Sequence, residues 1–289
     1  MMLVGALAAL LLGAGASAHG AATPDGYFVS SRAYSHRGWS DPIVFPRRPF
    51  ASHNHTFVGN VTTNAFSTPA SLRRGATSCN LRADTSAYWA PTLLQGGRPV
   101  LPRMATIYYR RLTTAAVKPF PQGLRMIAGN SKAHLSQSTR ITYWNCSVVK
   151  ATFYGVRAGS GRATARDLGA ASTSIPTCPA TAVLELHVNF PNCWNGKSLD
   201  SADHKDHMAY SSDGRCPAAF PVPVPALTLV YTYPPIAPKG AILSSGGQHS
   251  GHADFVNAWK ESALTKLVDG CLDHDRGCGI AGALAPDTP

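Results

Sequence analysis

The chain has 289 residues, which is enough for one large β domain or two smaller ones with a sizeable core. Its formal net charge is +11, although only 14% of its residues are charged. A basic surface suits an anionic polysaccharide, a cell-wall polymer or nucleic acid, but scattered arginines are equally typical of an arginine-rich coding bias. Because no ribonucleoprotein motif, helix-turn-helix or zinc-finger spacing occurs, we expect no nucleic acid partner.

The N-terminus has the composition of an export signal. Residues 1–18 are apolar and end in Ala16-Ser17-Ala18, which is typical of a secretory signal peptide and its cleavage site. The run is too short and too rich in glycine for a membrane span, and no other segment is long and apolar enough. We therefore expect a secreted protein, with His19 as the new N-terminus. An N-terminal histidine can chelate copper through its amine and ring together.

Seven cysteines in an exported chain predict disulfides with one thiol left over. Spacing does not determine connectivity, so proximity gives only a hypothesis. It favours the pairs Cys146–Cys178, Cys193–Cys216 and Cys271–Cys278, with Cys79 unpaired. Closing a loop of the size of residues 193–216 stabilises by about 3 kcal/mol in the chain-entropy model.

Short alternating or β-branched segments, punctuated by proline and glycine, predict strands along the chain. In chain order these are residues 43–45, 106–109, 124–128, 141–146, 184–190 and 226–233. Residues 158–174 are small and polar and indicate a surface loop. Residues 254–272 carry apolar side chains at helical spacing, with Asp254 placed to begin a helix.

Many strands and one late helix predict an all-β fold, a single jelly-roll-like β-sandwich with long loops and disulfides. No internal repeat or linker divides the chain. We expect a signal peptide at 1–18, a flexible lead at 19–31, one domain at 32–278, a disordered tail at 279–289, and a monomer.

Residues 184–210 hold the densest group of reactive side chains. Within the predicted strand Glu185, His187 and Asn189 share a polar face, and Pro191 ends the strand. An Asp- and His-rich loop follows. A polar strand face that opens into such a loop is typical of the floor and wall of a site, although a solvated sheet face beside a solvated loop gives the same pattern.

Two further motifs carry histidines. In a strand, His53 and His55 share a face, and two imidazoles at this spacing are a common way to present metal ligands, although two surface histidines are the commoner meaning of an isolated pair. Residues 243–255 are rich in glycine and serine, so the backbone bends sharply around His252 and Asp254.

Long motifs along the chain resemble a known family. SHRGWSDPIVFP, SHNHTFVGN, LHVNFPNCWNGKSLDSADHKDHMAY, CPAAFPVPVPALTL and SGGQHSGHADFVNAW follow one another as in the secreted bacterial and fungal domain-of-unknown-function family nineteen-ninety-six. The resemblance covers about residues 32–278. Members are exported and often sit beside carbohydrate-binding modules, which implies a glycan-related role. The family pattern also implies a cysteine near residues 30–35; its absence here accounts for the odd count and leaves Cys79 single.

These motifs predict one cleft in which histidines and aspartates from distant segments converge. The candidate catalytic residues are Asp254, Asp200, Asp203, His187, His53 and His55. The candidate substrate-binding residues are Asp41, Trp194, His204, His207, Tyr210 and His252.

Three functions fit this set. The first is a carbohydrate-active enzyme acting on polysaccharide or cell-wall glycan. A hydrolase would use paired carboxyl groups, Asp200 or Asp203 with Asp254. A lyase would use a histidine or Tyr210 as base.

The second is a metal-binding secreted protein, with zinc or copper held by His53, His55 and His187. The third is a non-catalytic glycan or cell-wall binding module, in which the same side chains only hydrogen-bond sugar.

Overall fold

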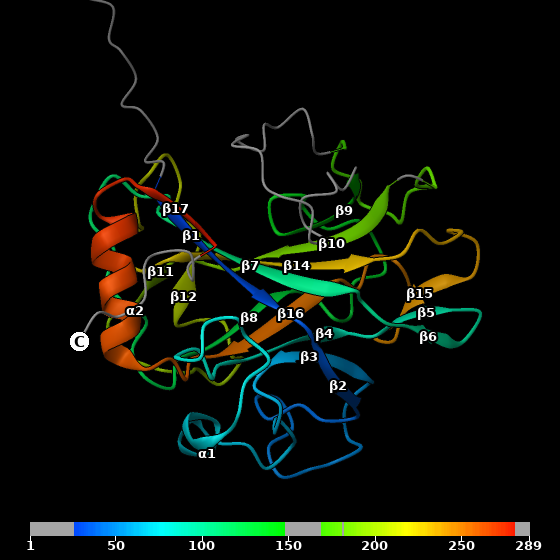
Figure 1. Ribbon diagram of the computed structural model, residues 1–289, viewed down its shortest axis with the longest axis horizontal. Coiled ribbons are helices and arrows are strands. Elements are labelled where there is room, and N and C mark those ends of the chain that lie inside the picture. Colours follow the sequence, from blue (N-terminus) through cyan, green and yellow to red (C-terminus); the bar gives the residue numbers. More distant parts are fainter. Residues whose placement is uncertain (1–25, 148–168, 181, 281–289) are drawn as a thin grey trace, which may run out of the picture.

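Two mainly antiparallel sheets lie face to face in the computed structural model, which describes residues 26–147, 169–180 and 182–280 (Figure 1). The six-stranded sheet has the order β17 (Gly277–Ile280), β1 (Tyr27–Arg32), β7 (Met104–Arg110), β14 (Ala226–Tyr233), β10 (Val183–Asn189) and β9 (Thr142–Ser147). The five-stranded sheet has the order β2 (Tyr34–Gly38), β3 (His55–Gly59), β4 (Ala87–Pro91), β16 (His252–Val256) and β8 (Arg125–Gly129). The predicted all-β sandwich is confirmed.

Smaller elements close the ends of the sandwich. One three-stranded sheet contains β12 (Met208–Ala209), β11 (Cys193–Trp194) and β13 (Val222–Pro223), and another contains β15 (Ala241–Leu243), β5 (Leu93–Gln95) and β6 (Arg98–Val100). The helices are α1 (Pro69–Arg74), α2 (Glu261–Leu267) and the π-helical turn η3 (Val268–Leu272). Helix α2 lies at one end of the sandwich, and β5, β6 and β15 lie at the other (Figure 1). The predicted C-terminal helix is present; α1 was not expected.

The core forms where the inward faces of both sheets meet. Leu186 and Leu229 come from the six-stranded sheet, and Met126 and Phe255 come from the five-stranded sheet. Alternation in β10 and β14 sends every second side chain into this layer, because successive strand residues point to opposite faces. The five predicted strands beyond residue 100 all overlap observed strands.

One predicted strand was wrong, and the predicted helix begins later than expected. Residues 43–45 form turns, because a carboxylate oxygen of Asp41 accepts hydrogen bonds from the backbone amides of Ile43 and Val44 at 3.0 and 2.9 Å. The helix expected over 254–272 is shorter, and Asp254 lies in strand β16 instead of capping it.

The start of the helix was predicted too early because Phe255 fits both the helical and the strand spacing of apolar residues. It aligns with later apolar residues at helical spacing, but with Ala253 it also fills the core between the sheets. His252 and Asp254 consequently point to the outer face of the five-stranded sheet.

All three disulfides expected from proximity are formed: Cys146–Cys178, Cys193–Cys216 and Cys271–Cys278. Cys79 is a free thiol, 3% exposed. It pairs with Arg32 in an isolated antiparallel bridge. Arg32 thus stands opposite Cys79, within the segment where the family pattern implies a cysteine.

Arg32 belongs to a buried polar network behind β1. Its guanidinium contacts the Cys79 sulfur, forms an ion pair with Asp84, and lies 4.2 Å above the Tyr88 ring centre. Both charged side chains are fully buried. The Asp84 carboxylate also accepts hydrogen bonds from the Tyr88 hydroxyl and the Ser86 amide, each at 3.0 Å. Such a pair is stable only while its hydrogen bonds are satisfied.

Within the described ranges, no helix is long and apolar enough to cross a membrane. The signal peptide at 1–18, His19, most of the 158–174 segment and the tail from 281 lie outside the described residues.

We expect Arg32→Met to lower the free energy of unfolding by about 3–5 kcal/mol, because it leaves the buried Asp84 carboxylate without its counter-charge. Urea unfolding measures this change. The exposed Arg37 of β2 provides the control, since Arg37→Met is expected to change stability by less than about 0.5 kcal/mol. A loss below about 1 kcal/mol for Arg32→Met would contradict the account of this network.

Candidate functional site

One cross-strand row on the outer face of the five-stranded sheet carries the site. Gly38 pairs with His55, His55 with Pro91, and His252 with Gly129. The register of β16 against β4 brings His252 level with Pro91. Two imidazoles therefore flank Pro91, and the row ends in a glycine on each side.

A third imidazole completes the group, which we call the histidine triad: His53, His55 and His252. Their ligand-type nitrogen atoms all lie within 4.8 Å of one another. The Nε2 atoms of His53 and His252 are 3.1 Å apart, and the ring centres of His53 and His55 are 4.2 Å apart. His55 and His252 are buried, whereas His53 is half-buried and forms the solvent side of the triad.

Two backbone carbonyls determine which nitrogen faces the centre. Nδ1 of His55 lies 3.0 Å from the Ser40 oxygen, and Nδ1 of His252 lies 2.8 Å from the Ser250 oxygen. A carbonyl only accepts, so each Nδ1 carries the proton and donates it. The Nε2 atoms of the neutral rings therefore present lone pairs to the centre. Nε2 of His55 is buried and has no hydrogen-bond partner among the described residues.

Burial keeps the triad neutral. It lowers the pKa of His53 to about 4. Burial, with the charge of His53 as a smaller contribution, lowers the pKa of His252 to about 3 and holds that of His55 well below its ordinary value. Three neutral imidazoles whose ring nitrogens converge are a donor set suited to zinc or copper, and hydrogen bonds at Nδ1 are of the kind that orients histidine ligands.

Two buried carboxyl groups accompany the triad. Asp254 is two residues after His252 on the same strand face, and its Oδ2 has no hydrogen-bond partner within the described part of the chain. Burial, with a smaller contribution from Asp41, raises the pKa of Asp254 well above its ordinary value. Burial also raises the pKa of Asp41, although the amides of Val44 and Ile43 oppose this by hydrogen bonding. Asp254 therefore keeps its proton to a higher pH than an ordinary carboxyl group.

The candidate catalytic residues Asp200 and Asp203 hold their loop in shape, together with the candidate substrate-binding residue His204. Asp200 forms an ion pair with Arg125 at 2.9 Å and bonds Nδ1 of His204 at 2.8 Å. Burial alone would raise the pKa of Asp200, but these hydrogen bonds keep it below its ordinary value. Asp203 is exposed, and its Oδ1 accepts from the amides of Lys205 and Asp206. Hydrogen bonding, chiefly from the Asp206 amide, lowers the pKa of Asp203.

His207 has the same structural role. It is fully buried, with Nε2 2.6 Å from the Arg125 carbonyl oxygen and Nδ1 2.9 Å from the Ser201 hydroxyl. Both ring nitrogens are thus occupied, Nε2 by strand β8 and Nδ1 by the loop.

The structure places His187 on the other sheet, which corrects its assignment as a metal ligand beside His53 and His55. β10 belongs to the six-stranded sheet, where Nε2 of His187 contacts Glu185 and Asn145, each at 3.2 Å, and its ring stacks on Tyr143. Alternation identified the polar face of this strand but not the sheet that contains it. His252, predicted only as a substrate-binding residue, takes the third position of the triad.

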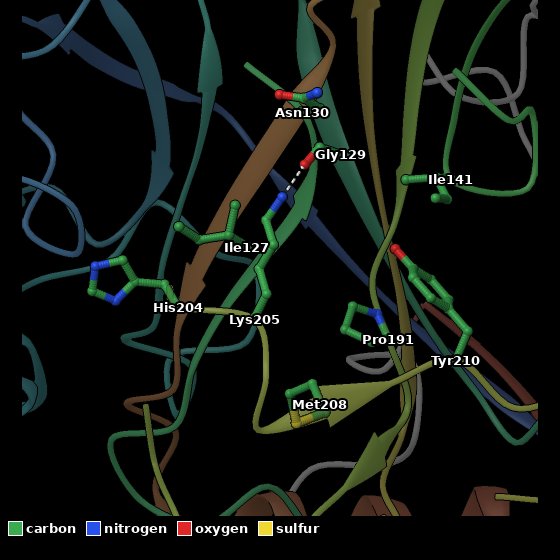
Figure 2. Close-up of a pocket in the computed structure, with 9 residues that line it drawn as sticks. All are labelled: Ile127, Gly129, Asn130, Ile141, Pro191, His204, Lys205, Met208 and Tyr210. Atoms are coloured by element: carbon green, nitrogen blue, oxygen red, sulfur yellow. Dashed lines mark hydrogen bonds between the residues drawn. The ribbon is translucent and has the colours of Figure 1, made fainter. Parts of the chain in front are cut away.

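A cavity of about 270 Å³ lies beside the row, lined by Gly129 and eight other residues (Figure 2). Ile127 and Gly129 of β8 form part of it, and in the ladder they pair with Asp254 and His252. His204 and Tyr210, both predicted substrate-binding residues, also line it. The Tyr210 hydroxyl donates to the Asn189 carbonyl at 2.8 Å.

Trp194, a predicted substrate-binding residue, is not among the residues that line the cavity. Its Nε1 donates to the Ser198 carbonyl at 2.7 Å, and β11 belongs to the small sheet with β12 and β13. The sequence prediction instead missed Trp39, which is 52% exposed and precedes the Ser40 that bonds His55. Phe50, 79% exposed, lies beside it with ring centres 6.4 Å apart. Aromatic content alone could not reveal this pair, because most aromatic residues are core.

A family model described as Domain of unknown function (DUF1996) matches residues 41–259, and the chain belongs to this family. The match spans every residue of the triad and the 200–210 loop. Comparison with curated proteins and with solved structures gave no match.

We expect the metal-free protein to lose stability as pH falls from about 6.5 to about 4. In this window the unfolded chain binds protons at histidines whose pKa is lowered in the folded state, so protons favour unfolding. Urea unfolding in chelator at several pH values measures the slope.

His53→Gln is expected to flatten that slope, because it removes one of the shifted groups. The exposed His134 gives the matched control, and His134→Gln should keep the wild-type slope. Equal slopes in wild type and His53→Gln would show that the triad does not resist protonation.

Proposed function

We propose that the histidine triad binds one divalent transition metal ion and that zinc is the best fit. The observation that supports this is the pair of backbone carbonyls, which leaves the buried Nε2 lone pair of His55 without a partner and turns Nε2 of His252 toward His53, 3.1 Å away. Leaving a buried acceptor unsatisfied costs about 1–3 kcal/mol, and a cation at the centre removes that cost.

Three protein ligands leave an open coordination position, which is typical of catalytic rather than structural zinc sites. A zinc ion bound in this way supplies an acidified water or polarises a substrate oxygen. A metal held by the triad would be reached from the side of His53, which is the half-buried member. Copper is the alternative ion for the same donor set.

The protein is, in this proposal, a secreted enzyme that hydrolyses polysaccharide at the triad. Three disulfides are compatible with an oxidising, extracellular setting. The exposed Trp39–Phe50 pair supports a glycan substrate, because aromatic faces stack on sugar rings and this pair adjoins the segment that contacts His55. Asp254, whose pKa is raised by burial and which is two residues from His252, is the candidate proton donor to the leaving group.

A non-catalytic glycan-binding module is the second candidate. The same aromatic pair favours it, since stacking alone gives binding. Turnover of a polysaccharide by the wild-type protein distinguishes the enzyme from the binding module.

Zinc titration of the metal-free protein is expected to give one site per chain. His53→Ala, His55→Ala and His252→Ala should each weaken binding by at least ~100-fold, because each removes a ligand. Isothermal titration calorimetry with zinc, and separately with copper, identifies the ion. His187→Ala is the matched control and should bind as wild type, because His187 lies on the opposite sheet. If the wild-type protein prepared without chelator binds no metal, the metal proposal is wrong.

Asp254→Asn should lower turnover on a polysaccharide panel by about 10²–10⁴-fold while zinc content is unchanged, because the amide cannot donate the proton. New reducing ends measure the rate. Asp203→Asn is the control and is expected to keep full turnover, since an amide oxygen still accepts the loop hydrogen bonds. Binding without turnover in the wild type would support the binding module.

A further inference from the structure

The cavity beside the triad differs from the rest of the site in its chemistry. Its apolar lining consists of Ile127, Ile141, Pro191 and Met208. The polar lining consists of the Asn130 amide, the Lys205 ammonium, the His204 ring and the Tyr210 hydroxyl, and no carboxylate lines it. At about 270 Å³ it is near the lower end of the ~300–1,000 Å³ typical of small-molecule sites.

Lys205 is the charged group of this cavity. Its side chain runs along β8, and Nζ donates to the Gly129 carbonyl at 2.6 Å (Figure 2). An ammonium has three donors, so two remain for a ligand. Among the described residues no carboxylate lies within 4.0 Å of Nζ. Lys205 therefore forms no ion pair among the described residues, although its charge acts on the buried Asp254 carboxyl group.

The surrounding loop fixes Lys205 before any ligand arrives. Asp203 accepts the Lys205 amide at 3.0 Å, and His204 is anchored on Asp200, which itself pairs with Arg125 of β8. The Cys193–Cys216 disulfide closes the whole segment. A side chain on a preorganised loop binds its ligand with less entropy lost on ordering.

Gly129 connects the cavity to the triad. It is the partner of His252 in the β16–β8 ladder, so the two lie on neighbouring strands about 5 Å apart. Gly129 has a φ of +81°, and a Cβ there would lie 2.4 Å from the Gly251 oxygen. No side chain can therefore separate His252 from the cavity.

We infer that this cavity binds an acidic sugar, a uronic acid residue whose carboxylate pairs with Lys205 while the apolar face of its ring lies against Ile127 and Pro191. This deepens the proposed function and rests on it, because it makes the cavity the subsite next to the metal centre. An amphipathic cavity fits a pyranose ring, which has one apolar face and polar edges. The unpaired cation selects the carboxylate, and the net charge of +11 favours the approach of a polyanion.

Calorimetry with trigalacturonate and with its fully methyl-esterified form tests the inference on the zinc-loaded protein. We expect the ester to bind at least ~10-fold more weakly than the acid. Lys205→Gln should weaken binding of the acid by a similar factor and leave binding of the ester unchanged. Lys205→Arg should stay within about threefold of wild type, because it keeps the charge. Lys239→Gln, at an exposed lysine between β14 and β15, is the matched control.

Equal affinity for acid and ester, no binding of either, or wild-type affinity in Lys205→Gln would overturn the inference. Zinc content of each variant distinguishes it from the proposed function. If zinc binds wild type but Lys205→Gln has no effect, the acidic-sugar subsite fails and the metal centre stands. If zinc does not bind but acid binding depends on Lys205, the subsite stands and the metal centre fails.

Discussion

Two hydrogen bonds from imidazole Nδ1 to backbone carbonyls determine what the outer face of the five-stranded sheet can do. The Ser40 and Ser250 oxygens accept hydrogen bonds from Nδ1 of His55 and of His252 and so select one tautomer of each ring. The Nε2 atoms are thereby left for the centre of the triad. Both carbonyls belong to loops. That of Ser40 precedes the turn held by Asp41, and that of Ser250 lies in a bend where the Ser245 and Ser250 hydroxyls are 2.7 Å apart. The strands supply the ligands, and the loops supply their orientation.

The polar residues around this centre divide into two groups. Asp254 and Asp41 are buried without a cation and stay close to the triad in the sheet or its covering loop. Asp200, Asp203, His204 and His207 satisfy one another and Arg125, so they shape the loop. A dense run of aspartate and histidine in the sequence marked the second group, where hydrogen bonds lower the pKa of Asp200 and Asp203. In the first group burial instead raises the pKa of the carboxyl groups, a shift that is typical of functional sites.

Sequence reasoning predicted the fold class and the disulfides because alternation, proline breaks and cysteine spacing are local signals. It also identified His53 and His55, since residues two apart in a strand share a face. It assigned His187 instead of His252, because alternation gives the face of a strand and not the sheet in which it pairs. The helix expected to begin at Asp254 hid the third ligand, as Phe255 fits both periods. Lys205 was missed, because a single lysine in a polar loop carries no pattern.

The sequestered Cys79 has a consequence for the chemistry of the folded chain. Burial raises the pKa of its thiol to about 12, and Arg32 of β1 covers its sulfur. Since only the thiolate attacks disulfides, the Cys79 thiol of the native protein does not exchange with the three disulfides. Alkylation of that sulfur requires β1 to detach, so the speed of labelling reports how often the N-terminal edge of the sandwich opens.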